Sequence, residues 1–100
     1  MIIYMSGPIT NVLDYEQKFA DAEAAIKKRY PDYEVINPTM IKLPSTCTHK
    51  QYMAIDFMLL DLADAVCMLP GWELSRGCNQ EYGYAMANNL IVLELEQLVR

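Results

Sequence analysis

The sequence predicts a single α/β domain, residues 1–100, built on a small doubly wound parallel sheet of the Rossmann or flavodoxin type. Three observations support this fold class. A length of 100 residues suffices for one domain but not for a second core. Several short runs are apolar without polar alternation, which is typical of strands buried on both faces. Helical segments separate these runs, and the order β-α-β-α-β-α-β implies about four to five strands with helices on both faces.

The first part of the chain is expected to form a strand, a helix and a second strand. Residues 2–5 (IIYM) are a short apolar run that ends at Ser6-Gly7-Pro8, as a buried strand would. Residues 11–29 follow as a helix, with Asn11 as its expected N-cap and basic residues in its last turn. Residues 33–36 (YEVI) form the second strand.

The second part continues the alternation. Residues 38–48 contain two prolines and lack periodicity, so they are expected to be a loop. A helix over 49–63 and a strand over 64–69 come next. After another loop, a helix is expected to extend to about Asn88. Residues 90–94 form the last strand, and a short turn of helix ends the chain.

The composition is that of an ordinary globular protein, with 53% hydrophobic and 21% charged residues. The net charge of −5 disfavours a nucleic-acid polymer as partner, because such surfaces are normally basic, but it permits a small anionic ligand. The N-terminal apolar run is too short for a signal peptide or a membrane span, so we expect a cytoplasmic protein with no membrane partner. Three cysteines without CxxC spacing and one histidine, His49, predict no metal site, and we expect no cofactor.

Ligands of a doubly wound sheet bind beyond the carboxyl ends of its strands. These ends lead into the loops 6–11, 37–48 and 70–77. The first loop offers Ser6, Gly7, Pro8 and Ile9 as binding residues. Gly7 would let the backbone approach a ligand closely, next to the unpaired N–H groups of a helix start. A plain strand-to-helix turn is the alternative explanation.

The loop before the third helix ends in Ser75-Arg76-Gly77. A hydroxyl, a guanidinium and a flexible backbone at a helix start could hold an anion. The alternative is an N-capping Ser75 beside a solvated Arg76. Trp72 could stack on a flat ligand or simply cover the edge of the core.

Asp56 is a carboxylate in an apolar helix. The residues three and four positions away are all apolar or aromatic: Tyr52, Met53, Leu59 and Leu60. Asp56 is therefore expected to be partly desolvated, with either a hydrogen-bonding partner or a raised pKa that suits an acid. A structural Asp bonded to the backbone or to a Tyr is the alternative. Because this helix is apolar nearly all round, a homo-oligomer that covers its second face is expected.

Glu81 lies near the expected start of the third helix, where acidic residues are common for structural reasons. The functional interpretation comes from convergence. Tyr4 closes the first strand, Asp56 lies in the apolar helix, and the Ser75-Arg76-Gly77 segment precedes Glu81. The predicted topology brings all of them to one edge of the sheet.

Four segments in this order resemble the nucleoside 2-deoxyribosyltransferase superfamily, and most closely its small domain-of-unknown-function branch found in phages and bacteria. They are YMSGPIT (4–10), INP (36–38), YMAIDFMLLDLADAVCMLPGWELSRGCNQEYGYA (52–85) and the final apolar strand. The resemblance covers most of the chain apart from the first helix and the 39–50 loop. It also implies that a neighbouring subunit often completes the site.

The resemblance implies a role for each matching residue. Glu81 would be a nucleophile that attacks C1′ of a 2′-deoxyribonucleoside or its 5′-monophosphate. Tyr4 would orient the Glu81 carboxylate, and Asp56 would protonate the leaving base. A Ser six residues before the glutamate, here Ser75, implies a 5′-monophosphate, and Arg76 adds positive charge there.

Three functions remain open at this point. The first is an enzyme that cleaves, or transfers a base at, the N-glycosidic bond of a nucleotide, since carboxylates stabilise or trap the oxocarbenium-like sugar. The second is a module that binds a nucleoside or nucleotide without turnover. The third is an interaction domain whose loops are only structural.

Overall fold

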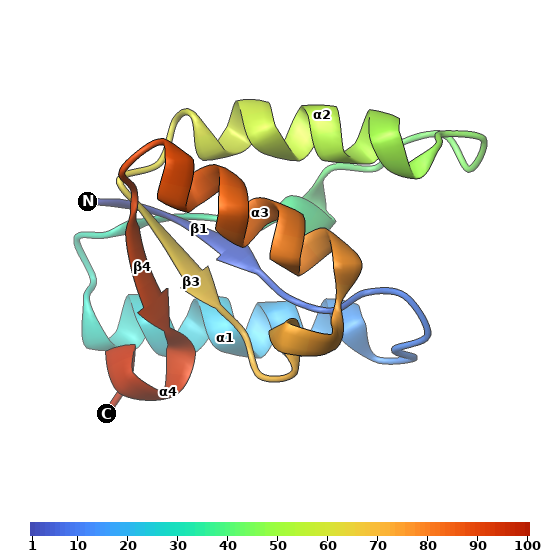
Figure 1. Ribbon diagram of the computed structural model, residues 1–100. Coiled ribbons are helices and arrows are strands. Elements are labelled where there is room, and N and C mark those ends of the chain that lie inside the picture. The colour runs from blue at the N-terminus through green and yellow to red at the C-terminus, as the bar shows by residue number, and fades with distance from the viewer.

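The protein contains one four-stranded, fully parallel sheet in the order β2-β1-β3-β4, as seen in a computed structural model of residues 1–100 (Figure 1). This arrangement confirms the predicted doubly wound α/β class. The strands are β1 (Ile2–Ser6), β2 (Glu34–Ile36), β3 (Ala65–Met68) and β4 (Ile91–Glu94). The helices are α1 (Tyr15–Arg29), α2 (His49–Leu60), α3 (Arg76–Ala87) and α4 (Leu95–Leu98), with 3-10 turns η1 (Pro38–Met40) and η2 (Trp72–Leu74).

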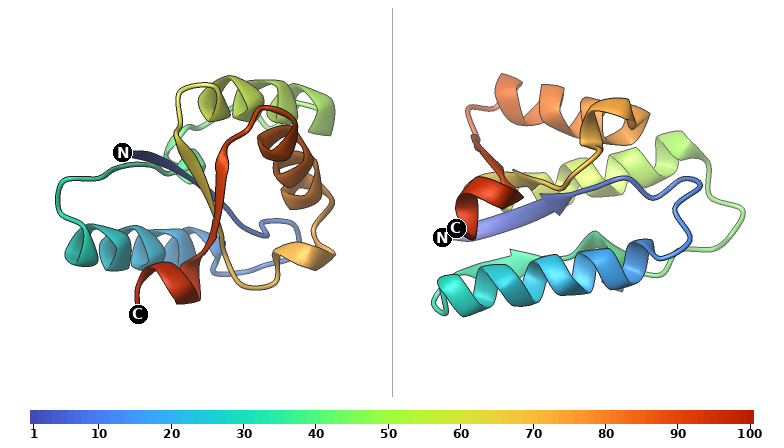
Figure 2. Two further views of the ribbon diagram at one scale, coloured as in Figure 1. Left: turned by 60° about the vertical axis from the view of Figure 1, so that its left-hand side comes forward. Right: turned by 90° about the horizontal axis from the view of Figure 1, so that it is seen from below.

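Helices cover both faces of the sheet. Figures 1 and 2 show α2 and α3 on one face and α1 with the short α4 on the other. Side chains alternate between these faces along a strand. In β1, Ile3 and Met5 join the core under α1, whereas Tyr4 joins the core under α2 and α3. Ser6 is on the same side of the strand as Tyr4, and both are buried.

The chain reverses its direction of travel across the sheet next to β1. From β1 it goes to β2 on one side, and from β3 it goes to β4 on the other. β1 and β3 pair in parallel up to Ser6 and Met68, so the loops that follow them diverge at this point. Such a switch point is where doubly wound folds form their ligand crevice.

The first helix begins later than predicted. α1 starts at Tyr15 with Asp14 at the N-cap position, so the expectation of Asn11 as N-cap is wrong. Asn11 has a φ of 62°, in the left-handed region that Asn tolerates better than most residues. Its conformation belongs to the turn before the helix.

The region between β2 and α2 is more ordered than the sequence indicated. Asn37 caps the η1 turn by accepting a hydrogen bond from the Thr39 N–H at 3.0 Å. Thr48 and Gln51 then form a reciprocal capping box that starts α2 at His49. α2 ends at Leu60, three residues before the predicted end.

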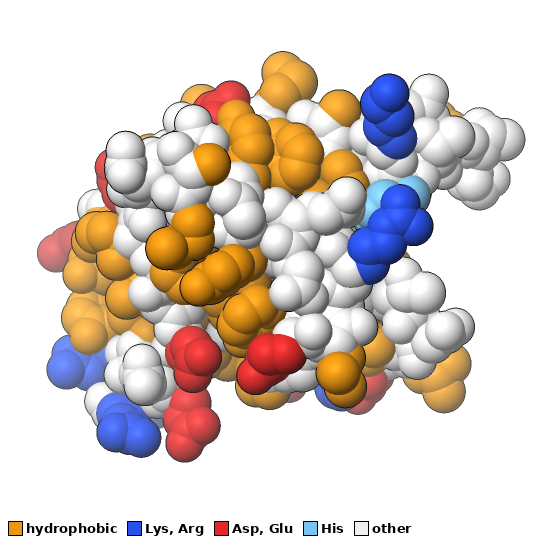
Figure 3. Space-filling model, in the orientation of Figure 1, with side chains coloured by type: hydrophobic (Ala, Val, Ile, Leu, Met, Phe, Trp, Pro, Cys, Tyr) orange, Lys and Arg blue, Asp and Glu red, His pale blue; other side chains and the backbone are white.

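The C-terminal end of α2 and the turn after it expose apolar side chains. Met58 and Leu62 are 69% and 62% exposed, although both are large hydrophobic residues. Figure 3 shows hydrophobic side chains gathered over α2 and α3. None of the helices combines the length and hydrophobicity needed to cross a membrane.

Candidate active site

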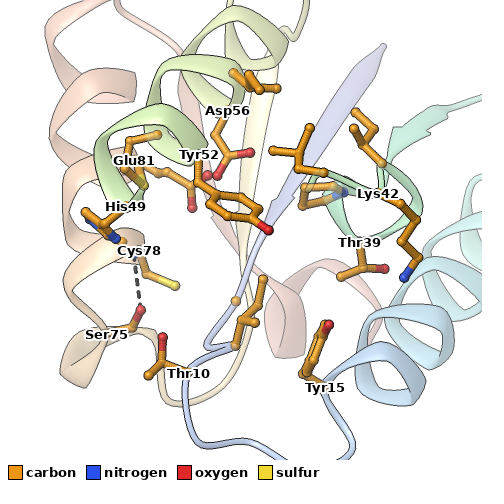
Figure 4. A pocket seen from close by; sticks show the side chains of 18 of the residues that line it. Thr10, Tyr15, Thr39, Lys42, His49, Tyr52, Asp56, Ser75, Cys78 and Glu81 are labelled. Atoms are coloured by element: carbon orange, nitrogen blue, oxygen red, sulfur yellow. Dashed lines mark hydrogen bonds between the residues drawn. The ribbon is translucent and has the colours of Figure 1, made fainter. Parts of the chain in front are cut away.

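A cleft of about 470 Å³ opens at the carboxyl ends of the strands (Figure 4). Its walls come from the loop after β1, the loop after β2, and the N-terminal parts of α2 and α3. Asp56 and Glu81 both line it, although 25 residues separate them in the sequence. The two carboxyls of the sequence analysis therefore share one cavity.

Glu81 is held from the strand beneath it. Its side chain is only 5% exposed, on the face of α3 that packs on the sheet. The Tyr4 hydroxyl donates to Oε2 of Glu81, and the Ser6 hydroxyl donates to Oε1 at 2.7 Å. Because Tyr4 and Ser6 are two residues apart in β1, both hydroxyls point to the same face. The β-strand period thus supplies one donor for each carboxylate oxygen.

The surroundings of Glu81 oppose its ionisation. Burial and, to a smaller extent, the nearby Asp56 raise the pKa of Glu81 to about 8, although the Tyr4 and Ser6 hydroxyls act in the opposite direction. Burial and the charge of Glu81 also raise the pKa of Tyr4, so the phenol remains a protonated donor. Glu81 is a carboxyl that can change its charge near neutral pH.

Asp56 contributes the second carboxyl from α2. It is half-buried, and burial raises its pKa, as its apolar helical neighbours predicted. Interacting carboxyls lose their protons in steps that belong to the pair. Asp56 and Glu81 therefore act as a pair that retains a proton at higher pH than a solvated carboxyl would.

The loop after β1 contributes only part of its predicted set. Gly7 and Ile9 line the cleft, whereas Pro8 lines a separate groove beside α1. A Cβ at Gly7 would lie 2.8 Å from Leu69 Cδ1 and 2.9 Å from Phe19 Cζ. Packing against the core under α1 thus explains the glycine without any ligand.

The start of α3, which begins at Arg76 with Ser75 as its N-cap, also differs from the predicted anion cradle. Ser75 lines the cleft, but its hydroxyl caps α3 by accepting a hydrogen bond from the Cys78 N–H at 3.2 Å. Gly77 lines the cleft as well, while Arg76 is exposed and lies outside it. Ser75 is therefore a capping residue and Arg76 a solvated one, and only Ser75 and Gly77 of the predicted cradle face the cleft, at the N-terminus of α3.

Two further candidate binding residues, Trp72 and Ser6, make contacts within the protein instead of facing the cleft. Trp72 lies outside the cleft and stacks on Tyr82, with ring centroids 5.0 Å apart. Ser6, predicted to contact the substrate, is 1% exposed and spends its hydroxyl on Glu81. Trp72 therefore covers the core edge, and Ser6 supports the site from below.

The cleft includes residues that sequence reasoning did not select. His49 and Met53 precede Asp56 by seven and three positions in α2, and both line the cleft with it. Helical spacing from Asp56 could have found His49. Its Nε2 lies 2.7 Å from Oε1 of Gln80 on α3. Lys42 also lines the cleft, but it lies in an aperiodic segment that gave no signal.

The remaining candidates for chemistry in the cleft are the Cys78 thiol and a metal site. Cys78 lines the cleft, but burial raises the pKa of its thiol, which disfavours the nucleophilic thiolate. No three side chains among His, Cys, Asp and Glu come together in a way that could hold a metal ion. The Cys78 thiol is therefore a weaker candidate for the nucleophile than the carboxyls of Asp56 and Glu81.

Comparison with known proteins gives a family but no activity. Residues 1–94 match the family model described as domain of unknown function DUF4406. No curated protein matches the chain, and neither does any solved structure. The match covers nearly the whole sequence, and the chain therefore belongs to the DUF4406 family.

Proposed function

We propose that this protein cleaves the N-glycosidic bond of a nucleoside or deoxynucleoside 5′-monophosphate, or transfers the base, with Glu81 as nucleophile. One observation carries the proposal. Glu81 is buried, each of its oxygens accepts a hydroxyl hydrogen bond from β1, and Asp56 lines the same cleft. Most enzymes that cleave glycosidic bonds use two carboxyl groups in one cavity.

Glu81 acts on the sugar. As the bond to the base breaks, C1′ gains positive charge, and the Glu81 carboxylate stabilises this charge or forms a covalent bond to C1′. Tyr4 and Ser6 fix both oxygens, so little reorganisation is required during the reaction. Water then releases the sugar in a hydrolase, whereas a second base accepts it in a transferase.

Asp56 acts on the leaving base. Departure of a base is easier when a ring nitrogen is protonated, and a carboxyl with a raised pKa can supply that proton. The Tyr4 and Ser6 hydroxyls both donate to Glu81 and favour its anion, whereas the only hydroxyl that favours the Asp56 anion is that of Tyr4, which already donates to Glu81. With substrate bound, the shared proton therefore belongs on Asp56, and the negative charge on Glu81.

The sugar phosphate lies at the N-terminus of α3. Ser75 and Gly77 line the cleft there, next to the first-turn N–H groups of a 12-residue helix. A helix N-terminus favours an anion through these groups and through its dipole. The Glu81 carboxyl lies in the second turn of the same helix, so sugar and phosphate can occupy adjacent parts of the cleft.

A panel of deoxynucleoside and ribonucleoside 5′-monophosphates, analysed by chromatography for free base, tests the proposal. Release of a base, lost in Glu81→Gln, is the expected result. The alternative function is a module that binds the nucleotide without turnover, and the raised pKa of Glu81 favours it because a protonated Glu81 is a poor nucleophile. Saturable binding without release of any base would support that alternative and contradict the enzyme.

We also propose that the chain forms a homo-oligomer through the C-terminal end of α2 and the turn after it. The exposed Met58 and Leu62 leave apolar area that a second copy would cover. Light scattering should then give a mass above the 11.5 kDa of one chain, and Met58→Glu should reduce it. A monomer at all concentrations would contradict this assembly.

A further inference from the structure

The cleft has two chemically different ends. In the order β2-β1-β3-β4, the loop after β2 and the loop after β3 lie on opposite sides of β1. Lys42 belongs to the former and Ser75 to the latter. Figure 4 shows these two side chains across the cleft from each other, with the Asp56 carboxyl on the Lys42 side of Glu81. The carboxyl pair therefore separates a Ser75 end from a Lys42 end.

Lys42 is the only lysine or arginine that lines the cleft. Its Nζ lies 2.7 Å from Oε2 of Glu16, on the first turn of α1. This hydrogen bond raises the pKa of Lys42, so the ammonium stays charged. An ammonium has three N–H donors and no acceptor. Glu16 occupies one of them and restrains the long side chain, which leaves two donors for a ligand.

The proposed reaction assigns a part of the substrate to each end. The phosphate occupies the Ser75 end at the α3 N-terminus. Asp56 must reach the leaving base to protonate it, so the base lies on its side of Glu81, toward Lys42 (Figure 4). Thr39 and Tyr15 also line this end, but a hydroxyl can donate or accept and discriminates little. Lys42 can only donate.

We propose that Lys42 selects bases with an exocyclic keto oxygen over bases with an exocyclic amino group at the same position. This inference rests on the proposed function, from which it takes the orientation of the substrate. A keto oxygen accepts a hydrogen bond from the ammonium. An amino group offers only donors, which leaves it facing a cation without a partner and costs binding free energy.

Two pairs of nucleotides isolate this difference. dUMP and dCMP differ in the exocyclic group of a pyrimidine, and dIMP and dAMP differ in that of a purine. Dissociation constants are measured by calorimetry on the Glu81→Gln protein, so that turnover does not interfere. In at least one pair we expect the keto member to bind about tenfold more tightly, as for a single hydrogen bond to a charged donor.

The Lys42→Met substitution should bring the keto-to-amino ratio close to one, mainly by weakening the keto member. Lys50→Met is the matched control, because Lys50 is an exposed lysine outside the cleft, and it should keep the ratio. An equal affinity for keto and amino members, or a preference that survives in Lys42→Met, overturns the proposal. Equal weakening of all four nucleotides also overturns it, because Lys42 would then contact the phosphate.

Base release from the unmodified protein separates the two proposals. A Lys42-dependent keto preference in binding, without release of any base, would remove the enzymatic function and leave base selection standing. Release of the two bases of each pair at equal rates, with no preference in binding, would support the enzymatic function and overturn base selection by Lys42. If none of the four nucleotides binds, both proposals are wrong.

Discussion

The two faces of the sheet share strands but differ in chemistry. Under α1, strand β1 contributes only apolar side chains, Ile3 and Met5, which pack with Ile26 of the helix. Under α2 and α3, the next residues of the same strand β1 are Tyr4 and Ser6, and they meet the buried Glu81. Neighbouring residues of β1 thus point to different faces of the sheet. One face is packed with apolar side chains, and the other holds a buried carboxyl.

The difference shows where this small domain obtains stability and where it gives some up. Each fully buried apolar side chain under α1 contributes about 1.5–3 kcal/mol through removal from water. Burial of Glu81 acts in the opposite direction whenever the carboxyl is ionised, as its raised pKa indicates. Apolar burial on the α1 face offsets the free-energy cost of burying the Glu81 carboxyl, which the packing of the fold does not require.

The largest expected effect lies on the polar face. Glu81→Gln keeps the shape of the side chain but removes the nucleophile, so base release should fall by at least about 10³-fold. The circular dichroism spectrum should remain unchanged. Glu73→Gln, the same substitution at an exposed position outside the cleft, is the matched control and should keep full activity. Full activity in Glu81→Gln would remove Glu81 from the mechanism.

A substitution in the apolar core under α1 should lower stability and leave activity unchanged. Ile26 is completely buried under the sheet, and Ile26→Ala should lower the free energy of unfolding by about 2–5 kcal/mol. Denaturant titration measures this loss. The folded fraction should retain the turnover number of the unmodified protein, because Ile26 does not line the cleft. A large change in turnover would show that the two faces are coupled.

Ser6→Ala tests the contact that joins β1 to the site. It removes the hydroxyl that donates to Oε1 of Glu81 at 2.7 Å and leaves the Tyr4 hydrogen bond in place. We expect turnover to fall by about tenfold, as for loss of one hydrogen bond to a charged group. Ser6→Thr retains a hydroxyl and should recover part of the activity. An unchanged turnover in Ser6→Ala would limit Ser6 to a packing role.

The contrast between the faces also explains what the sequence could predict. The strand runs and the helices between them gave the fold, because burial on both faces leaves a pattern in the local composition. Asp56 was detectable because its helical neighbours are apolar, which makes a carboxyl there conspicuous. The resemblance named Tyr4 as the partner of Glu81, and the structure shows that contact.

The remaining site residues depend on three-dimensional contacts. Ser6 supports Glu81 rather than a ligand because of a pairing across 75 residues. Arg76 lies between Ser75 and Gly77 and Trp72 lies three residues before Ser75, but the turn of the helix and stacking on Tyr82 direct their side chains away from the cleft. Lys42 follows no periodic pattern at all. Proximity in the sequence therefore did not predict which side chains face the cleft, because neighbouring side chains point in different directions.

The last expected effect concerns the dependence of stability on pH. The pKa of Glu81 is raised by burial to about 8 from an ordinary 4.5. Between these values the folded protein holds a proton that the unfolded chain has lost, so stability falls as pH rises from about 4.5 to about 8 and then levels off. Gln does not titrate and escapes this loss. The melting temperature of Glu81→Gln, relative to the unmodified protein, should therefore increase between pH 5 and pH 8.5 by at least about 4 °C.

Thermal unfolding at several pH values measures this difference, and the matched Glu73→Gln variant shows whether it belongs to the buried position. In Glu73→Gln the difference from the unmodified protein should stay constant, because Glu73 is exposed. A difference that stays flat in Glu81→Gln as well would mean that Glu81 is ionised in the folded protein throughout the range. The two hydroxyls of β1 would then outweigh burial, and the polar face would cost the fold no more than the apolar one.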